Sequence, residues 1–179
     1  GKRARCPTCN AIVDVPGDVS VASPTMLSAE KSDVIDYELF GEENQYAEIT
    51  LDPGEITVAR MEHVLYMSPG ITMADADASD DNNNGGLLEK ISQVSRRIIS
   101  GSTLRLTAFC NVAEQREVVA FAPPEASRLI PIHLDEFQRN ILCQADTILC
   151  VARGIAISDV DVSGISDKLT MQIITGDGI

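Results

Sequence analysis

The sequence predicts an all-β domain with one helix. Three observations lead to this prediction. Hydrophobic residues make up 44% of the 179-residue chain, whereas aromatic residues make up 4% and Trp is absent, so the core must be aliphatic. Segments rich in branched aliphatic residues alternate with turn signals, which is typical of strands. Only one segment shows a convincing helical periodicity.

The first sixteen residues, GKRARCPTCNAIVDVP, contain a CxxC pair formed by Cys6 and Cys9. A structural zinc site needs four ligands. Cys110, Cys143 and Cys150 lie in apolar strand-like segments, where a thiol usually packs as a small hydrophobe, and both histidines are isolated in apolar contexts. We therefore expect Cys6 and Cys9 to bind zinc only together with a further CxxC pair upstream. The alternative is an exposed CxxC pair that binds no metal.

The charge is divided unevenly along the chain. The formal net charge is −13, and Lys2, Arg3 and Arg5 make the first sixteen residues basic. The acidic remainder repels phosphate backbones, so we expect the main domain not to bind nucleic acid. The sequence shows neither a signal peptide nor an apolar segment long enough to span a bilayer. Together with five cysteines, an odd number, this predicts a reducing compartment and a cytoplasmic location.

Residues 17–36 are small and polar without sustained periodicity, which predicts a linker. The main domain is then expected over residues 37–179. Asp52-Pro53-Gly54-Glu55 is a turn signature, and its flanks, YAEITL and EITVAR, alternate apolar and polar residues as half-buried strands do. A second turn, at residues 68–70, separates HVLYM from ITM.

The segment ADADASDDNNNGG resembles a calcium loop in its alternating acidic residues, but Asp80 and Gly86 occupy positions that need Gly and Glu in an EF-hand. We expect a solvated loop instead. The following GLLEKISQVSRRIIS carries an apolar stripe at helical spacing and predicts the one helix. Further strands are predicted in STLRLTAFCNV, REVVAFA, RLIPIHL and NILCQADTILCVA.

The chain contains an internal similarity that predicts two tandem repeats. EHVLYMSPGITMADAD, which starts at residue 62, aligns without a gap with DTILCVARGIAISDVD, which starts at residue 146. In this alignment Asp75 and Asp77 correspond to Asp159 and Asp161. Farther on, IISGSTL (98–104) aligns with IITGDGI (173–179) at an offset reduced to 75, so we expect the second repeat to be incomplete, ending where its next strand would begin. The alternative is that any two hairpins with a Gly turn align this well.

Four segments, LDPGEITVARMEHVLYMSPGITM, RRIISGSTLRLTAFCN, VVAFAPPEASRLIPIHL and ILCQADTILCVARGI, resemble in this order the altered-inheritance-of-mitochondria (AIM24-like) family. This resemblance implies a duplicated sandwich that is similar to the tryptophan RNA-binding attenuation protein (TRAP-like) fold and to the double-stranded β-helix. It also implies homo-oligomerisation and no established catalytic residue. The family usually has Phe at position 105, so Arg105 is not expected in the core. The first sixteen residues resemble the second half of a CPxCG-type zinc ribbon.

We expect a non-enzymatic protein, either an oligomeric scaffold or an interaction domain, because no nucleophile–base set or phosphate-binding glycine loop stands out. Zinc at the ribbon is the one cofactor expected. One alternative is a metal or small-ligand site built from the repeat-related carboxylates, because Asp75 and Asp77 share a strand face, as do Asp159 and Asp161. Another alternative is RNA binding through the basic N-terminal ribbon. The expected partners are further copies of the chain or another protein.

Overall fold

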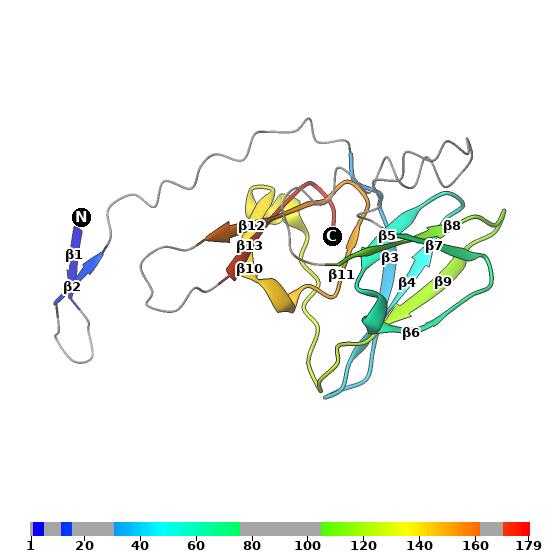
Figure 1. The fold of residues 1–179 in the computed structure, drawn as a ribbon, viewed down its shortest axis with the longest axis horizontal. Helices are drawn as coiled ribbons and strands as arrows, with labels where there is room; N and C mark the ends of the chain where they lie inside the picture. The colour runs from blue at the N-terminus through cyan, green and yellow to red at the C-terminus, as the bar shows by residue number, and fades with distance from the viewer. Residues whose placement is uncertain (1, 6–11, 16–30, 76–104, 162–169) are drawn as a thin grey trace.

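The structure is a computed structural model, and it describes residues 2–5, 12–15, 31–75, 105–161 and 170–179 (Figure 1). The described residues form strands joined by turns and three short 3-10 segments, so the fold is all-β. The predicted helix and the acidic loop before it lie outside the described residues. The strands are β1 (Lys2–Arg5), β2 (Ile12–Val15), β3 (Asp36–Phe40), β4 (Tyr46–Leu51), β5 (Ile56–Ala59), β6 (Val64–Met67), β7 (Ile71–Asp75), β8 (Thr107–Asn111), β9 (Glu117–Phe121), β10 (Asn140–Gln144), β11 (Cys150–Ala152), β12 (Ala156–Asp161) and β13 (Thr170–Thr175), and the 3-10 segments are η1 (Met61–His63), η2 (Leu134–Phe137) and η3 (Ala145–Thr147).

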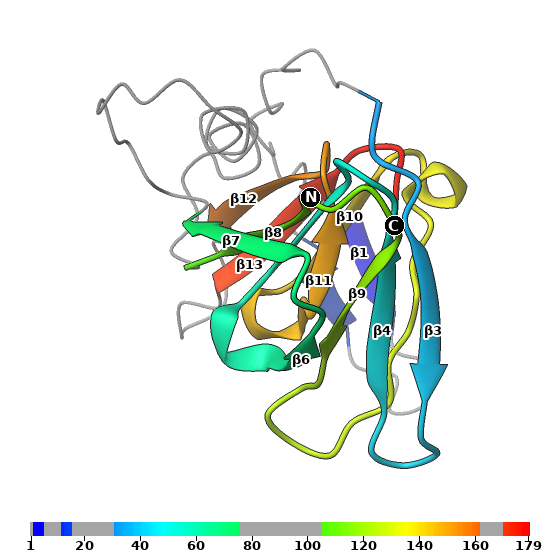
Figure 2. The ribbon, with the colours of Figure 1, turned by 90° about the vertical axis from the view of Figure 1, so that its right-hand side faces the viewer.

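The strands form four antiparallel sheets (Figures 1 and 2). Sheet I has the order β3-β4-β9-β6, sheet II has the order β11-β5-β8-β7, and sheet III has the order β10-β13-β12. Strands β1 and β2 form a separate hairpin. Strand β11 belongs to the second predicted repeat but pairs with β5 of the first, so sheet II contains strands of both.

The core of the sandwich lies between sheets I and II. Phe109 on β8 and Phe121 on β9 are fully buried, and their rings meet edge to face with centroids 5.1 Å apart. Burying a side chain of this kind stabilises a fold by about 1.5–3 kcal/mol. Strand β4 alternates between buried and half-buried residues, as its sequence predicts. Arg105 is exposed, which agrees with the expectation that it lies outside the core.

Strand β5 differs from the prediction of a half-buried strand, because all four of its residues are buried. It lies between β11 and β8 in the middle of sheet II, where neighbouring strands cover both of its edges. Its one polar side chain is satisfied, since Thr57 Oγ1 donates a hydrogen bond of 3.0 Å to the Val151 carbonyl. A buried hydroxyl without such a partner would destabilise the fold.

Both predicted turns are confirmed, but neither closes a hairpin. In the first turn the Glu55 N–H donates to the Asp52 carbonyl at 3.0 Å, and Gly54 has a φ of +85°, which glycine adopts without strain. In the second turn the Ile71 N–H donates to the Ser68 carbonyl at 3.1 Å. Each turn takes the chain from sheet I to sheet II, because β4 and β6 belong to the former and β5 and β7 to the latter.

The predicted strand RLIPIHL is wrong, because residues 128–134 pair with no strand of a described sheet. Pro131 has no N–H to contribute to a ladder. The segment is held near its two ends instead. The Leu129 N–H donates to Gln45 Oε1 at 2.8 Å, and the Leu134 N–H donates to the Gly178 carbonyl at 3.0 Å.

The end of the predicted linker packs against the main domain. Ser32 and Ile35 are buried, and the Ser32 N–H donates to Asp177 Oδ1 at 2.9 Å. Asp36 already belongs to β3. Residues 17–30 lie outside the described part of the chain, so the ordered domain includes residues 31–36 in addition to the predicted range.

Two sets of strand registers are related by the offset of 84 that the predicted repeat uses, but they match the third strands at a different offset from the sequence alignment. In the first repeat Ile56 and Thr72 both lie opposite Cys110. The residues 84 positions later, Asn140 and Ala156, both lie opposite Thr175. The third strands therefore correspond at an offset of 65, not 75, because the ladders match β13 with β8. By this match β13 corresponds to β8, whereas the sequence alignment of residues 173–179 expected the counterpart of that strand to begin only after residue 179.

Candidate functional site

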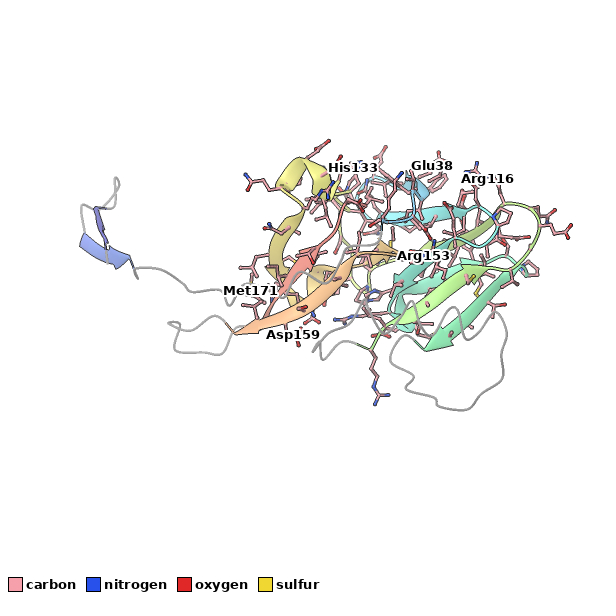
Figure 3. The ribbon with its side chains drawn as sticks, turned by 90° about the horizontal axis from the view of Figure 1, so that it is seen from above. Glu38, Arg116, His133, Arg153, Asp159 and Met171 are labelled. Atoms are coloured by element: carbon pink, nitrogen blue, oxygen red, sulfur yellow. The ribbon has the colours of Figure 1, made fainter. Side chains whose placement is uncertain are left out.

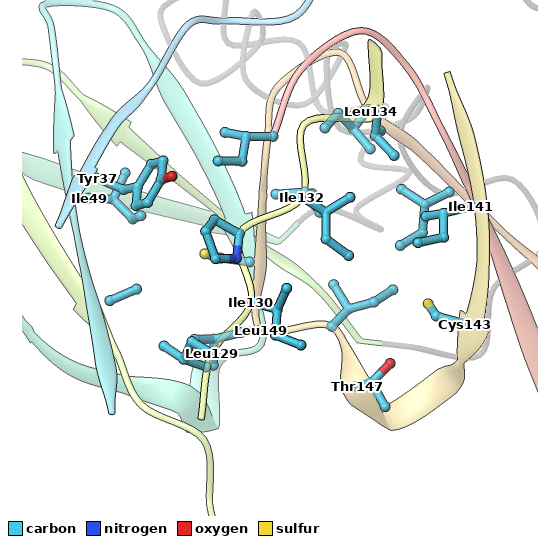
Figure 4. A pocket seen from close by; sticks show the side chains of 18 of the residues that line it. Tyr37, Ile49, Leu129, Ile130, Ile132, Leu134, Ile141, Cys143, Thr147 and Leu149 are labelled. Carbon is cyan, nitrogen blue, oxygen red and sulfur yellow. The ribbon is translucent and has the colours of Figure 1, made fainter. Parts of the chain in front are cut away.

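An apolar cavity of about 420 Å³ lies between sheets I and III (Figure 4). Its volume falls in the range of small-molecule sites, about 300–1,000 Å³. Strands β3 and β4 form one wall and β10 forms the other, while residues 128–134 run between them (Figure 4). The lining is predominantly aliphatic and includes Ile35, Leu39, Ile49, Leu129, Ile132, Ile141, Ile148 and Leu149.

Strand periodicity explains how the sequence builds these walls. Tyr37 and Leu39 are two residues apart on β3, and Ile141 and Cys143 are two residues apart on β10, so each pair points to one side of its strand. Leu142, between the β10 pair, does not line the cavity and is exposed. The alternating sequence of β10 therefore places one set of apolar side chains in the cavity and leaves Leu142 outside it.

Few groups in the cavity can take part in polar chemistry. Tyr37, Thr147 and Arg128 line it, and the Tyr37 ring lies 6.3 Å from that of His133. Desolvation raises the pKa of the Cys150 thiol to about 12. That thiol is neutral at physiological pH, so it lacks the thiolate that a nucleophile or a metal ligand requires. The cavity is suited to holding an apolar group.

A second feature is a pair of outermost strands with exposed apolar side chains. Strand β6 is the last strand of sheet I, and β10 is the first strand of sheet III. Leu65, Tyr66 and Met67 on β6 are exposed, and so is Leu142 on β10. An outermost strand offers unpaired backbone N–H and C=O groups to another chain, and exposed apolar side chains strengthen such a contact.

The described residues give the predicted metal ligands no shared site. Asp159 lies on β12 (Figure 3) and accepts a hydrogen bond of 2.9 Å from Gln172 Nε2. Asp75 ends β7 and Asp161 ends β12, and their side chains lie outside the described part of the structure, as do Asp77, Cys6 and Cys9 altogether. No three His, Cys, Asp or Glu residues in the described ranges gather where they could hold a metal ion. The aspartate hypothesis stays a prediction.

The two histidines have different surroundings. His63 is buried, and desolvation, together with the nearby Arg60 charge, lowers its pKa. His133 is exposed. His63 is therefore packed inside the fold, and His133 lies at its surface.

Neither the cavity nor the β6 and β10 edges were predicted as sites from the sequence. The cavity takes its lining from segments far apart in the sequence, so no local motif marks it. The edges can be found from the repeat alignment only once the strand pairing is known. The repeat alignment matches β6 with β11, and β11 has a strand partner in the other repeat.

Comparisons with known proteins place these features in context. A family described as "Mitochondrial biogenesis AIM24" matches residues 37–179. The crystal structure of protein SPYM3_0169 from Streptococcus pyogenes is similar, with a TM-score of 0.57 and 15% sequence identity over 79% of this chain and 61% of that chain. The present chain thus spans about three fifths of that protein, and the likeness shows the fold alone. No curated protein matches the chain. Among the described residues, no helix has the length and apolarity needed to cross a membrane.

Proposed function

The chain belongs to the AIM24 family, and from this premise we propose that it acts as a non-enzymatic, homo-oligomeric scaffold. The observation that carries this proposal is the pair of outermost strands, β6 and β10, which expose apolar side chains on edges that no other described strand covers. Exposed apolar side chains gathered at a sheet edge are typical of an interaction surface. The description of the family, mitochondrial biogenesis, sets the cellular process in which we expect this scaffold to act.

The absence of catalysis is part of the proposal. Its support comes from the chemistry of the cavity, where aliphatic side chains predominate and the Cys150 thiol is held neutral. A catalytic site normally brings together groups whose pKa values are shifted toward the working pH. Cys150 has its pKa shifted away from that range, and buried His63 is not among the residues that line the cavity.

Light scattering coupled to size-exclusion chromatography tests the scaffold. We expect the full chain to elute with a mass that is a multiple of 19.3 kDa. Leu65→Glu places a charge on the exposed edge of β6 and should reduce the mass to that of the monomer. Val34→Glu is the matched control, because Val34 is 76% exposed and precedes β3 outside any strand. A wild-type chain that is monomeric at every concentration would overturn the proposal.

A second candidate function is the binding of an apolar small molecule, which the cavity of about 420 Å³ favours. A long-chain fatty acid has suitable chemistry, because its chain would contact the aliphatic walls and Arg128 at the lining could attract its carboxylate. Titration with a fluorescent long-chain fatty acid tests this function. Thr147→Phe should weaken binding because Thr147 lines the cavity, while Gln144→Phe should not, because Gln144 is exposed and outside the lining. If the two variants bind the fatty acid with equal affinity, the cavity is not its binding site.

We also propose zinc at the N-terminal ribbon. Strands β1 and β2 pair antiparallel, with Arg5 opposite Ile12, so the backbone on either side of the CxxC segment comes together as in a hairpin. Such a hairpin is compatible with a ribbon in which Cys6 and Cys9 supply two ligands and an upstream pair supplies two more. Elemental analysis of the full-length gene product tests this, and a zinc content of zero would refute it.

A further inference from the structure

We propose that copies of this chain assemble head to tail, with β6 of one copy pairing antiparallel with β10 of the next. The pairing would join sheet I of one copy to sheet III of its neighbour. This inference rests on the proposed oligomeric scaffold and specifies the contact that builds it. The partner that pairs with each of these outermost strands is a second copy of the same chain.

The template for this contact exists inside the chain. Strand β11 of the second repeat pairs with β5 of the first repeat. By the repeat offset of 84, the counterpart of β11 is β6 and the counterpart of β5 is β10. Both counterparts are outermost strands of their sheets. The chain therefore makes one of two equivalent junctions internally, and within the described ranges the two strands of the other junction have no strand partner on their outer edges.

The template also predicts the register of the contact. Within the chain the opposed residues are Cys150 and Ala59, Val151 and Val58, and Ala152 and Thr57. To obtain the register between two copies, we take the residue 84 positions before each residue of β11 and the residue 84 positions after each residue of β5. The opposed residues between two copies are then Tyr66 and Cys143, Met67 and Leu142, and Ser68 and Ile141.

The burial of equivalent residues supports this register. At the internal junction, Val58 is 1% exposed and Val151 is 5% exposed. Their counterparts, Leu142 and Met67, are apolar as well but are 49% and 38% exposed. The same repeat positions are thus buried where the junction is made and open to solvent where it is not. A second copy would cover both side chains.

The backbone of β6 presents the correct edge. Successive residues of a strand direct their N–H and C=O groups to opposite edges. The Ser68 N–H donates to the Val118 carbonyl of sheet I at 2.9 Å, so the groups of Met67 face the free edge. In the template, the Arg153 N–H donates to the Ile56 carbonyl at 3.0 Å, which shows that Val151, two residues earlier, faces β5. Met67 and Val151 are repeat counterparts. The edge of β6 that no described strand covers therefore corresponds to the edge through which β11 pairs with β5.

The backbone of β10 presents the matching edge. The Gly176 N–H donates to the Arg139 carbonyl at 3.1 Å, so Arg139 faces β13. Leu142, three residues later, faces the opposite edge by the same alternation. Met67 and Leu142 can therefore exchange hydrogen bonds as a pair. Because the two edges belong to different strands, the contact is heterologous, and repeating it generates a ring if the rotation closes.

A disulfide tests the register. If Met67 and Leu142 form the hydrogen-bonded pair, Tyr66 and Cys143 form the adjacent non-hydrogen-bonded pair, with Cα atoms about 4.5 Å apart. A disulfide accepts Cα separations of about 4.4–6.8 Å. Under mild oxidation, Tyr66→Cys should become covalently linked between copies, and peptide mass spectrometry should find the new thiol joined to native Cys143. Tyr66→Cys combined with Cys143→Ser should lose this link, and Leu65→Cys, one residue out of register, should not form it.

The outcomes separate this contact from the scaffold itself. An oligomer that forms no disulfide between position 66 and Cys143 would overturn the β6–β10 pairing but not oligomerisation, whereas a monomer would overturn both. Should Tyr66→Cys fail to fold, Leu142→Lys in the otherwise native chain gives a second test. It should reduce the mass to that of the monomer, while Ile130→Lys, at an apolar residue that is 81% exposed and lies on no strand, should not. An unchanged mass for Leu142→Lys would also overturn the pairing.

Discussion

Arg153, which Figure 3 labels, forms an ion pair with Asp33, a residue 120 positions away in the sequence. Arg153 Nη2 and Nε donate to Asp33 Oδ1 at 2.5 and 3.1 Å, and Asp33 Oδ2 accepts the Ile56 N–H at 3.1 Å. The Asp33 N–H donates in turn to the Arg153 carbonyl at 3.0 Å. One carboxylate therefore joins the segment before β3, the start of β5 and the turn after β11, next to the β11–β5 junction.

We predict that Asp33→Asn destabilises the protein. The Asp33 side chain is almost fully buried, whereas Arg153 is partly exposed. In the variant, water can therefore solvate the Arg153 guanidinium and compensate for part of the lost ion-pair energy. The expected decrease in the free energy of unfolding is about 1–3 kcal/mol, measured by urea denaturation. Asp36→Asn is the control, because the Asp36–Arg116 ion pair is exposed on both sides and solvent screening leaves such pairs with little effect on stability. Equal losses would contradict the structural role of Asp33.

Gly154→Ala should destabilise the protein more than Gly54→Ala does. Both glycines have a positive φ, +95° and +85°, so alanine is strained at either position. A Cβ atom at position 154 would lie 2.8 Å from Ser32 Cα, whereas one at position 54 would meet nothing within 4 Å. We expect a loss of about 1–2 kcal/mol for Gly54→Ala and at least about 1 kcal/mol more for Gly154→Ala. Thermal unfolding measures both, and equal midpoints would refute the close approach of Ser32.

His63 should make stability depend on pH. Desolvation lowers its pKa in the folded state below the ordinary value of 6.5, so the unfolded chain binds the proton more readily. Its contribution is present above pH 6.5 and decreases as the pH falls toward and through the folded-state pKa. Urea denaturation between pH 7.5 and 5 should therefore show a steeper loss of stability for the wild type than for His63→Gln. Parallel pH profiles would contradict the lowered pKa.

Cys150 should resist alkylation in the folded protein. Desolvation raises the pKa of Cys150 to about 12, so almost none of the thiol is ionised at pH 8. Iodoacetamide at pH 8, followed by peptide mass spectrometry, should leave Cys150 unmodified in the native state and modify it in urea. Rapid labelling of the native protein would show that the thiol is neither desolvated nor protonated as the structure indicates.

Much of the local structure could be predicted from the sequence. The alternation in β4, the turns around Gly54 and Ser68 and the offset of 84 between repeats all agree with the observed strands and registers. The segment with Pro131 could not be assigned correctly, because an apolar extended segment has the same composition whether it pairs in a sheet or lines a cavity. The helix, the acidic loop and the CxxC pair lie outside the described residues and stay predictions.

The sequence by itself determined where most of the described strands and turns occur, since alternation and turn residues act over a few neighbouring positions. Only the tertiary structure decided which strands are neighbours. It buried β5 on both faces, matched β13 with β8 at an offset of 65 and brought Asp33 to Arg153. The physical reason is that a strand's pattern specifies its inward face but not its partner. Partners are selected by packing and hydrogen bonding between segments far apart in the chain, and these also leave β6 and β10 at the outside of their sheets.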